Sequence, residues 1–166
     1  MKKTLLFFGL LMGSSTALAN IHISPEVRLG PYFGSGISGG GLQLGLTDIL
    51  GTDALYLSHS HLSAEFITDK DRIKTYRLGA QYDFSTVPSL GFQVELGMLE
   101  YEGSRTILNT QTRSGTGISS AFAWVYNVNS NLGVRAGMDI NYIDKSKSFL
   151  SSDLSATFNA GVILHF

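Results

Sequence analysis

The chain contains no cysteine, so a disulfide framework, a cysteine-held metal site and a cysteine-linked lipid anchor are all excluded. Charged residues make up 15% of the 166 residues, against roughly 25% in an ordinary soluble domain. After residue 19, no segment is apolar over the roughly 18 consecutive residues that would suggest a transmembrane helix. The formal net charge is −1 and there is no basic stripe, which does not favour nucleic-acid binding.

A secretory signal is predicted at the N-terminus. Two lysines precede an apolar run over residues 5–12, and small residues then lead to an A-x-A site that ends at Ala19. A basic start, a short apolar run and such a site are typical of a cleaved signal peptide. We therefore expect residues 1–19 to be removed and residues 20–166 to form a single domain.

The rest of the chain is tiled by segments in which every second residue is apolar, a pattern that indicates strands with one apolar face. The segments cover residues 27–33, 42–46, 54–66, 76–84, 90–98, 118–126, 132–142 and 158–166. A secreted chain that is apolar on average and lacks a spanning helix has one membrane architecture left to it, a closed barrel. The sequence therefore predicts an all-β fold, an eight-stranded antiparallel up-and-down transmembrane β-barrel.

The two faces of the predicted strands differ in a way that favours lipid outside and polar side chains inside. The apolar face carries aromatic residues at the strand ends, as in the two aromatic girdles of a membrane barrel. One girdle would contain Tyr82, Phe84, Phe92, Trp124, Tyr126 and Phe166, and the other Phe66, Tyr76 and Tyr142. A soluble eight-stranded barrel would place its apolar face inside instead.

Six charged residues fall on the inward parity at overlapping heights. They are Glu26, Arg28, Arg77, Glu95, Arg135 and Asp139. Three cations and three anions inside so narrow a barrel are expected to pair into a plug, because unpaired buried charge is expensive. A gated, narrow ion channel is the functional alternative for the same residues.

Residues 54–66 form the one irregular segment. Leu55 and Leu57 have one parity and Leu62 the other, which predicts a β-bulge near residues 58–60. The polar residues His59, His61, Ser63 and Glu65 share one parity and are expected to line the lumen in a row. A base, a nucleophile and a carboxylate in one row could support hydrolysis, whereas two histidines alone do not complete a zinc shell.

The connections between the strands are predicted to be short. Periplasmic turns are expected at residues 47–53, 85–89 and 127–131, and outer loops at residues 34–40, 68–72, 103–115 and 143–152. Short loops argue against an adhesin that depends on projecting strands. Outside the lumen, the basic residues after residue 19 all map to the outer side, namely Lys70, Arg72, Lys74, Arg105, Arg113, Lys145 and Lys147. We expect Lys70, Arg72 and Lys74, led by Lys74, to contact lipopolysaccharide phosphates.

Together these features resemble the small outer-membrane barrels of Gram-negative bacteria, the OmpX and OmpA transmembrane-domain type. The resemblance covers residues 20–166 and includes the terminal aromatic residue. In that class the last strand resembles a signal read by the barrel-assembly machinery, and the matching residues here are Gly161, Leu164 and Phe166. The resemblance implies a monomeric outer-membrane protein with a structural or surface-interaction role, in contact with lipid and lipopolysaccharide, without enzymatic activity.

Two motifs point toward other functions. Gly34, Gly36 and Gly39 have the spacing of a dinucleotide-binding fingerprint, but a strand pattern follows where the motif needs a helix, so no cofactor is expected. The His-x-Ser sequence that ends at Ser63 resembles the motif of the outer-membrane lipid A deacylases. In that family the motif lies late in the chain and continues with Asn-Ala, whereas Ala64 follows here. A lipid A-modifying hydrolase is therefore the alternative function.

Overall fold

The computed structural model describes residues 20–29, 37–66, 69–106 and 109–166. Eight strands follow one another along the chain, with one turn of 3₁₀-helix before the last. They are β1 (Ile21–Leu29), β2 (Ile37–Ile49), β3 (Thr52–Phe66), β4 (Asp69–Phe84), β5 (Val87–Thr106), β6 (Thr110–Asn127), β7 (Leu132–Tyr142), η1 (Lys145–Lys147) and β8 (Leu154–His165). The predicted signal peptide and residues 34–36 of the predicted loop at residues 34–40 lie outside the described residues, whereas residues 37–40 belong to β2 and not to a loop.

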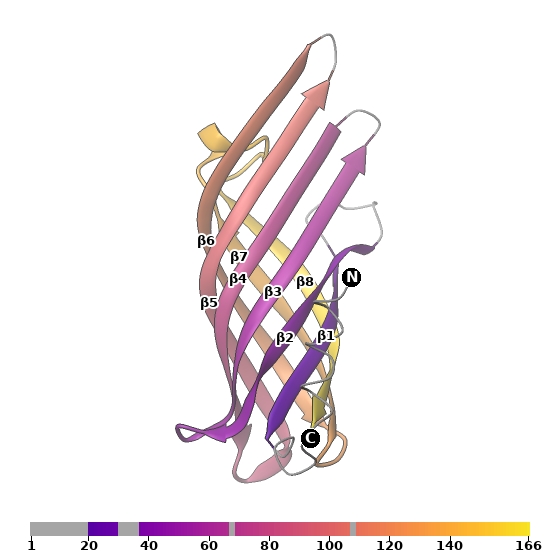
Figure 1. The fold of residues 1–166 in the computed structure, drawn as a ribbon, viewed down its shortest axis with the longest axis vertical. Coiled ribbons are helices and arrows are strands. Elements are labelled where there is room, and N and C mark those ends of the chain that lie inside the picture. Colours follow the sequence, from indigo (N-terminus) through magenta and orange to yellow (C-terminus); the bar gives the residue numbers. More distant parts are fainter. Residues whose placement is uncertain (1–19, 30–36, 67–68, 107–108) are drawn as a thin grey trace, which may run out of the picture.

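Each strand pairs antiparallel with its neighbours, and β8 pairs back to β1, so the sheet closes into a barrel (Figure 1). The closing register places His22 opposite His165 and Glu26 opposite Gly161. At the end of the barrel that holds the C-terminus, the backbone N–H of Ile21 donates to the carbonyl oxygen of Phe166. The predicted fold class is confirmed. No helix in the described parts of the chain is long and apolar enough to cross a membrane.

The side chains alternate between an apolar outer face and a polar interior over the part of the barrel nearest the termini. Exposed outward residues include Leu44, Leu57, Leu78, Leu96 and Trp124, whereas the buried inward residues include Gln43, Gln81, Gln93, Asn141 and Thr157. Aromatic rings gather outside near the terminal end, where the rings of Tyr82 and Phe92 stack 5.6 Å apart. This arrangement is the inverse of a soluble barrel and suits a hydrocarbon surrounding.

The outer face changes character at one level around four strands. Tyr76, Met98, Ile118 and Tyr142 lie side by side on β4 to β7 and are the last large apolar residues on the outer face of those strands. Beyond this row, which we call the apolar boundary, the next outward residue on β4 is Lys74 and the next on β5 is Glu100. A common level on neighbouring strands is what the edge of a hydrocarbon layer requires.

Four strands continue well past the apolar boundary and form a projecting sheet, so two predicted outer loops are wrong. β3 and β4 remain paired as far as Phe66 and Asp69, and β5 and β6 as far as Thr106 and Thr110. In Figure 1 these four strands rise above the others, with the β5–β6 hairpin reaching furthest. The outward positions in residues 69–72, 103–106 and 109–115 are polar and so do not indicate a lipid-facing strand, but outside a membrane a strand can present a polar face to water.

β3 is continuous, and the predicted β-bulge is absent. The register of β3 with β4 runs from Ala54 to Phe66 without a shift. The parity change arises because the apolar requirement moves to the other face beyond the boundary. Beyond it Leu62 faces inward and is 4% exposed, and His61 faces outward, as does His59 at the level of Tyr76.

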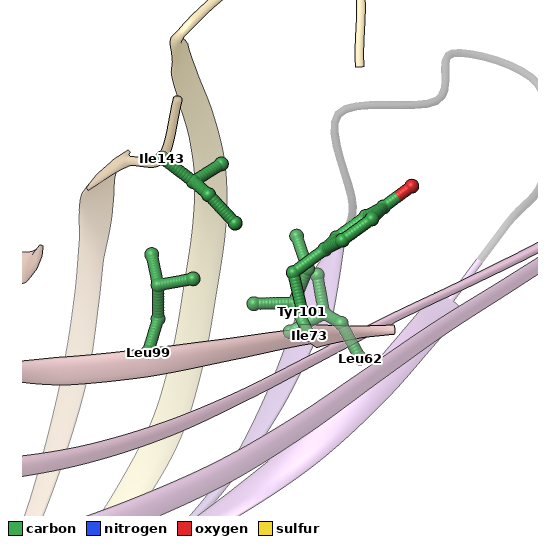
Figure 2. Close-up of a cluster of buried hydrophobic side chains, with 5 residues drawn as sticks. All are labelled: Leu62, Ile73, Leu99, Tyr101 and Ile143. Carbon is green, nitrogen blue, oxygen red and sulfur yellow. The ribbon is translucent and has the colours of Figure 1, made fainter. Parts of the chain in front are cut away.

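The mouth of the barrel under the projecting sheet is filled by an apolar cluster. Its members are Leu62, Ile73, Leu99, Tyr101 and Ile143, with Leu150 packed against them. Figure 2 shows Ile143, which follows β7, reaching toward the strand that carries Leu99 and Tyr101. Because the five cluster members are at most 4% exposed, the loop over residues 143–153 covers the mouth and does not extend freely into solvent.

Polar contacts hold this loop against the projecting hairpin. The ring of Phe149 lies between two guanidinium groups, with Arg105 4.7 Å and Arg113 4.6 Å from its centroid. The Phe149 N–H donates to the Tyr101 hydroxyl at 3.0 Å, and that hydroxyl donates to Asp71. Burial raises the pKa of Tyr101 to about 12, so the hydroxyl remains a donor at neutral pH.

Replacing Tyr101 with phenylalanine should loosen the loop without opening the barrel. The change removes the acceptor of the Phe149 N–H and one donor to Asp71, at a cost of about 1–3 kcal/mol. We expect trypsin to cut at Lys145 and Lys147 several times faster than in the parent, while unboiled protein keeps its folded gel mobility. Tyr142→Phe, on the outer face, is the matched control and should leave cleavage unchanged; equal cleavage of both variants would contradict this role of Tyr101.

Candidate functional site

The six charged residues assigned to the lumen meet in one closed ring. Glu26 and Arg28 come from β1, Arg77 from β4, Glu95 from β5, and Arg135 and Asp139 from β7. Their side chains are at most 1% exposed. Each of the six lies next in sequence to an apolar residue that faces outward, so the alternation along the strand directs its own side chain into the lumen. The strand register then brings them to one height.

Every member of the ring contacts two partners of opposite charge. Arg77 lies 2.7 Å from Glu95 and 3.3 Å from Asp139. Arg135 lies 2.7 Å from Glu26 and 3.5 Å from Glu95. Arg28 closes the circle by pairing with both Glu26 and Asp139. The ring carries no net charge, which is the condition under which buried ions are tolerated.

Neutral side chains complete the hydrogen bonding of the ring carboxylates. The amide of Gln43 donates to Glu95 at 2.6 Å, and Thr157 and Asn159 donate to Asp139 at 2.8 and 3.1 Å. Buried ions gain most when their remaining lone pairs are satisfied in this way. The ring and its neutral neighbours therefore fill the middle of the barrel with a connected polar network.

Glycines on β2 and β8 leave the space that the ring needs. A Cβ at Gly161 would lie 2.6 Å from the Pro25 carbonyl oxygen and 3.0 Å from the Glu26 Cβ, and a Cβ at Gly41 would overlap the Glu26 carboxylate. Gly161, assigned above to an assembly signal, thus has a packing reason to be glycine as well.

The row of His59, His61, Ser63 and Glu65 lies on the outer face of β3, so its expected inward orientation is wrong. His59 hydrogen-bonds through Nδ1 to the Thr75 carbonyl oxygen at 3.1 Å and stacks on Tyr76 with centroids 4.7 Å apart. Glu65 pairs with Lys70. No hydrogen bond joins these four side chains to one another in the described structure, so they do not form the nucleophile–base contact of a hydrolase.

A histidine pair near the termini was not found from the sequence. His22 is fully buried, stacks on Tyr56 with centroids 4.8 Å apart, and shares a 3.0 Å contact between its Nδ1 and Nε2 of His165. Its other nitrogen contacts Gln43 at 3.1 Å. The inward parity of His22 indicates a side chain in the lumen. Its partner His165 lies 143 residues away in the sequence, however, and only the register between β1 and β8 brings the two together. Across the described residues, no three side chains are grouped to hold a metal ion.

The seven outer basic residues occupy three different surroundings. Lys70, Arg72 and Lys74 lie along the outer face of β4, Arg105 and Arg113 hold Phe149 on the inner side, and Lys145 and Lys147 are exposed in η1. Lys70 pairs with Glu65, and Lys74 lies 3.7 Å from Glu102. Within the described part of the chain, Arg72 has no carboxylate in ion-pair distance. Of the three cations on β4, Arg72, and not Lys74, is therefore the one that is available to bind an anion.

Removing one cation from the ring should cost more than removing a matched pair of opposite charges. Arg135→Met leaves the ring with an excess negative charge and should destabilise the barrel by about 3–5 kcal/mol. The Glu26→Gln and Arg135→Met double variant restores neutrality and should recover part of that loss. Unfolding in urea, followed by gel mobility of the protein in lipid vesicles, measures both.

Arg72→Gln serves as the control for losing an exposed arginine and should change stability by less than about 1 kcal/mol. A double variant no more stable than Arg135→Met alone would show that neutrality of the ring does not govern its stability.

Comparisons with known proteins show the fold. No family model matches the chain, and no curated protein sequence matches it. The N-terminal β-barrel domain of Pseudomonas aeruginosa OprF is 16% identical, with a TM-score of 0.59 over 89% of this chain and 97% of that one. Neisserial surface protein A is 14% identical, with a TM-score of 0.57 over 88% and 96%.

Ail, the attachment invasion locus protein of Yersinia pestis, is 13% identical, with a TM-score of 0.65 over 89% of this chain and 97% of that one. At these identities the likeness concerns architecture alone, and it extends over nearly the whole length of each protein. The chain therefore has the fold of the small eight-stranded outer-membrane barrels.

Proposed function

We propose that the protein is an integral barrel of a Gram-negative outer membrane whose role is structural and surface-interacting. Its projecting sheet faces the outside, its lumen stays closed, and it acts as a monomer without enzymatic activity. The observation that carries the proposal is the apolar boundary, beyond which β4, β5 and β6 exchange an apolar outer face for a polar one and continue. Strands that only sealed a barrel would have no reason to extend past the hydrocarbon.

The projecting sheet replaces the expectation of short loops and favours a surface role. It presents backbone and side chains from β3 to β6 above the membrane, held in place by strand pairing. A rigid platform suits interaction with other molecules, because little conformational entropy is lost when it binds. Two observations support the absence of hydrolase activity: His59 and Glu65 are each engaged elsewhere, and Ser63 has no base among its described hydrogen-bond partners.

Lipopolysaccharide is the proposed molecular contact of the outer face. Lys70, Arg72 and Lys74 form a column of cations on β4 that begins directly above Tyr76. Phosphates of lipopolysaccharide would lie along this column, and charge-assisted hydrogen bonds to phosphate are among the stronger polar contacts. Glu65, Glu100 and Glu102 share the face, so the effect is local and depends on the arrangement of charges rather than on their sum.

Replacing Lys70, Arg72 and Lys74 together with glutamine should reduce the lipopolysaccharide that copurifies at low salt by several fold. Each exposed pair is worth at most about 1 kcal/mol, so the contacts act as a cluster and should weaken as salt rises. Folded gel mobility should not change. The Lys145→Gln and Lys147→Gln variant is the control, since it removes exposed positive charge from η1. Equal loss of copurifying lipopolysaccharide in both variants, or no loss in the triple variant, would show that the three cations are only a solvated surface.

The terminal residues Gly161, Leu164 and Phe166 are proposed to be read by the barrel-assembly machinery. Phe166 is exposed on the outer face, and its backbone joins β1. Phe166→Ala keeps those backbone bonds and removes the ring. We expect several-fold less barrel in the outer membrane of cells, with periplasmic degradation, while refolding of the purified chain into lipid vesicles proceeds as for the parent. Equal insertion in cells would reduce the ring to a lipid contact.

A further inference from the structure

A groove on the outer face of the projecting sheet has no role in the barrel itself. It has a volume of about 430 Å³ and lies across β4, β5 and β6. Its outward side chains are Lys70, Arg72, Glu102, Ser104, Thr112 and Ser114. The register arranges them in two rows across the strands, Lys70–Ser104–Thr112 and Arg72–Glu102–Ser114. Cations therefore stand on one side of the groove and hydroxyl groups on the other.

Arg72 supplies the available positive charge of the groove. Lys70 is engaged by Glu65 on the neighbouring strand. Arg113 also lines the groove, but its guanidinium lies over Phe149 and donates to the carbonyl oxygen of Ser148 in the loop. The exposed guanidinium of Arg72 can present two parallel N–H groups, which matches the geometry of a phosphate.

The rest of the groove suits sugar hydroxyl groups. Ser104, Thr112 and Ser114 offer hydroxyls that both donate and accept, and Glu102 accepts. Glu102 is also approached by Lys74 at 3.7 Å, which offsets its repulsion of an anion bound at Arg72. One anionic end and several neutral polar contacts along three strands describe a phosphorylated saccharide better than an isolated phosphate.

The height of the groove separates it from the lipid phosphates. At about 3.3 Å per residue and a tilt of about 40°, Lys74 lies about 5 Å above the apolar boundary, Arg72 about 10 Å and Lys70 about 15 Å. The headgroup layer of one leaflet is about 5–8 Å thick, half the difference between the whole bilayer and its hydrocarbon core. Lys74 is thus level with phosphates carried directly on the lipid, whereas the groove lies above them.

We propose that this groove binds the phosphorylated core saccharide of a neighbouring lipopolysaccharide molecule, with a phosphate at Arg72 and sugar hydroxyls along Glu102, Ser104 and Ser114. The proposal rests on the outer-membrane placement above and refines it, because it assigns Lys74 to the lipid phosphate and Arg72 to the sugar. An anionic saccharide could also come from outside the cell. Ail, for example, has been solved with the heparin analogue sucrose octasulfate.

The test uses core oligosaccharide released from lipopolysaccharide by mild acid, which carries the sugars and their phosphates without lipid. Binding to the purified full-length mature barrel in detergent is measured by calorimetry. We expect Arg72→Gln to weaken binding about fivefold, and Ser104→Ala with Ser114→Ala to weaken it severalfold. The Lys145→Gln, Lys147→Gln control should stay within twofold of the parent. Enzymatic removal of the phosphates from the oligosaccharide should weaken binding as much as Arg72→Gln does.

Three results would overturn the assignment: no binding of the core oligosaccharide, equal binding after dephosphorylation, or a heparin oligosaccharide bound tightly where the core oligosaccharide is not. In each case the copurification of intact lipopolysaccharide still tests the contact proposed for Lys70, Arg72 and Lys74. Loss of copurification in the triple variant together with no binding of the core oligosaccharide would retain the proposed lipid contact and remove the groove from it.

Discussion

Hydrocarbon offers no hydrogen bonds, and the rest of this structure depends on that constraint. Every backbone group within the apolar band must find its partner in the sheet, so β8 has to return to β1 and leave no edge. Eight strands then enclose a space that only side chains can fill. Charges within it must neutralise one another, and the ring of three arginines and three carboxylates does so with two partners for each member.

Above the apolar boundary the same constraint no longer applies, and the structure changes accordingly. The outer face becomes charged, and β3 to β6 can end at different heights because water satisfies their free groups. The interior becomes apolar at that level, with Leu62, Ile73 and Leu99 over the ionic ring. The lumen is thus filled by two layers of different chemistry, an ionic layer within the membrane band and an apolar layer above it.

The alternation of apolar and polar residues predicted the fold and the lumen-facing residues within the apolar band. It predicted wrong side-chain orientations above the band, where the apolar side chains face the interior of the barrel. Within the band, one rule assigns every residue to lipid or lumen, and Arg77 or Glu95 could be placed by parity without knowing the partner strands. Beyond the boundary the rule reverses, so applying it there wrongly predicts a lipid-facing Leu62, a β-bulge and, as a result, an inward-facing His59. The apolar boundary becomes visible only when the four strands are aligned side by side, so it cannot be recognised from the sequence of one strand. Contacts such as Phe149 between Arg105 and Arg113 depend on an irregular loop and have no periodic signal.

The guanidinium groups around Phe149 have a mechanical consequence. An antiparallel hairpin that stands alone above a membrane bends like a rod fixed at one end. Here the rod is propped near its tip, because residues 143–153 connect it to β7 and β8, the two strands that follow β6 around the barrel. A sideways force on the β5–β6 tip would therefore be shared with β7 and β8. Such bracing lets a thin extension keep its shape in moving liquid.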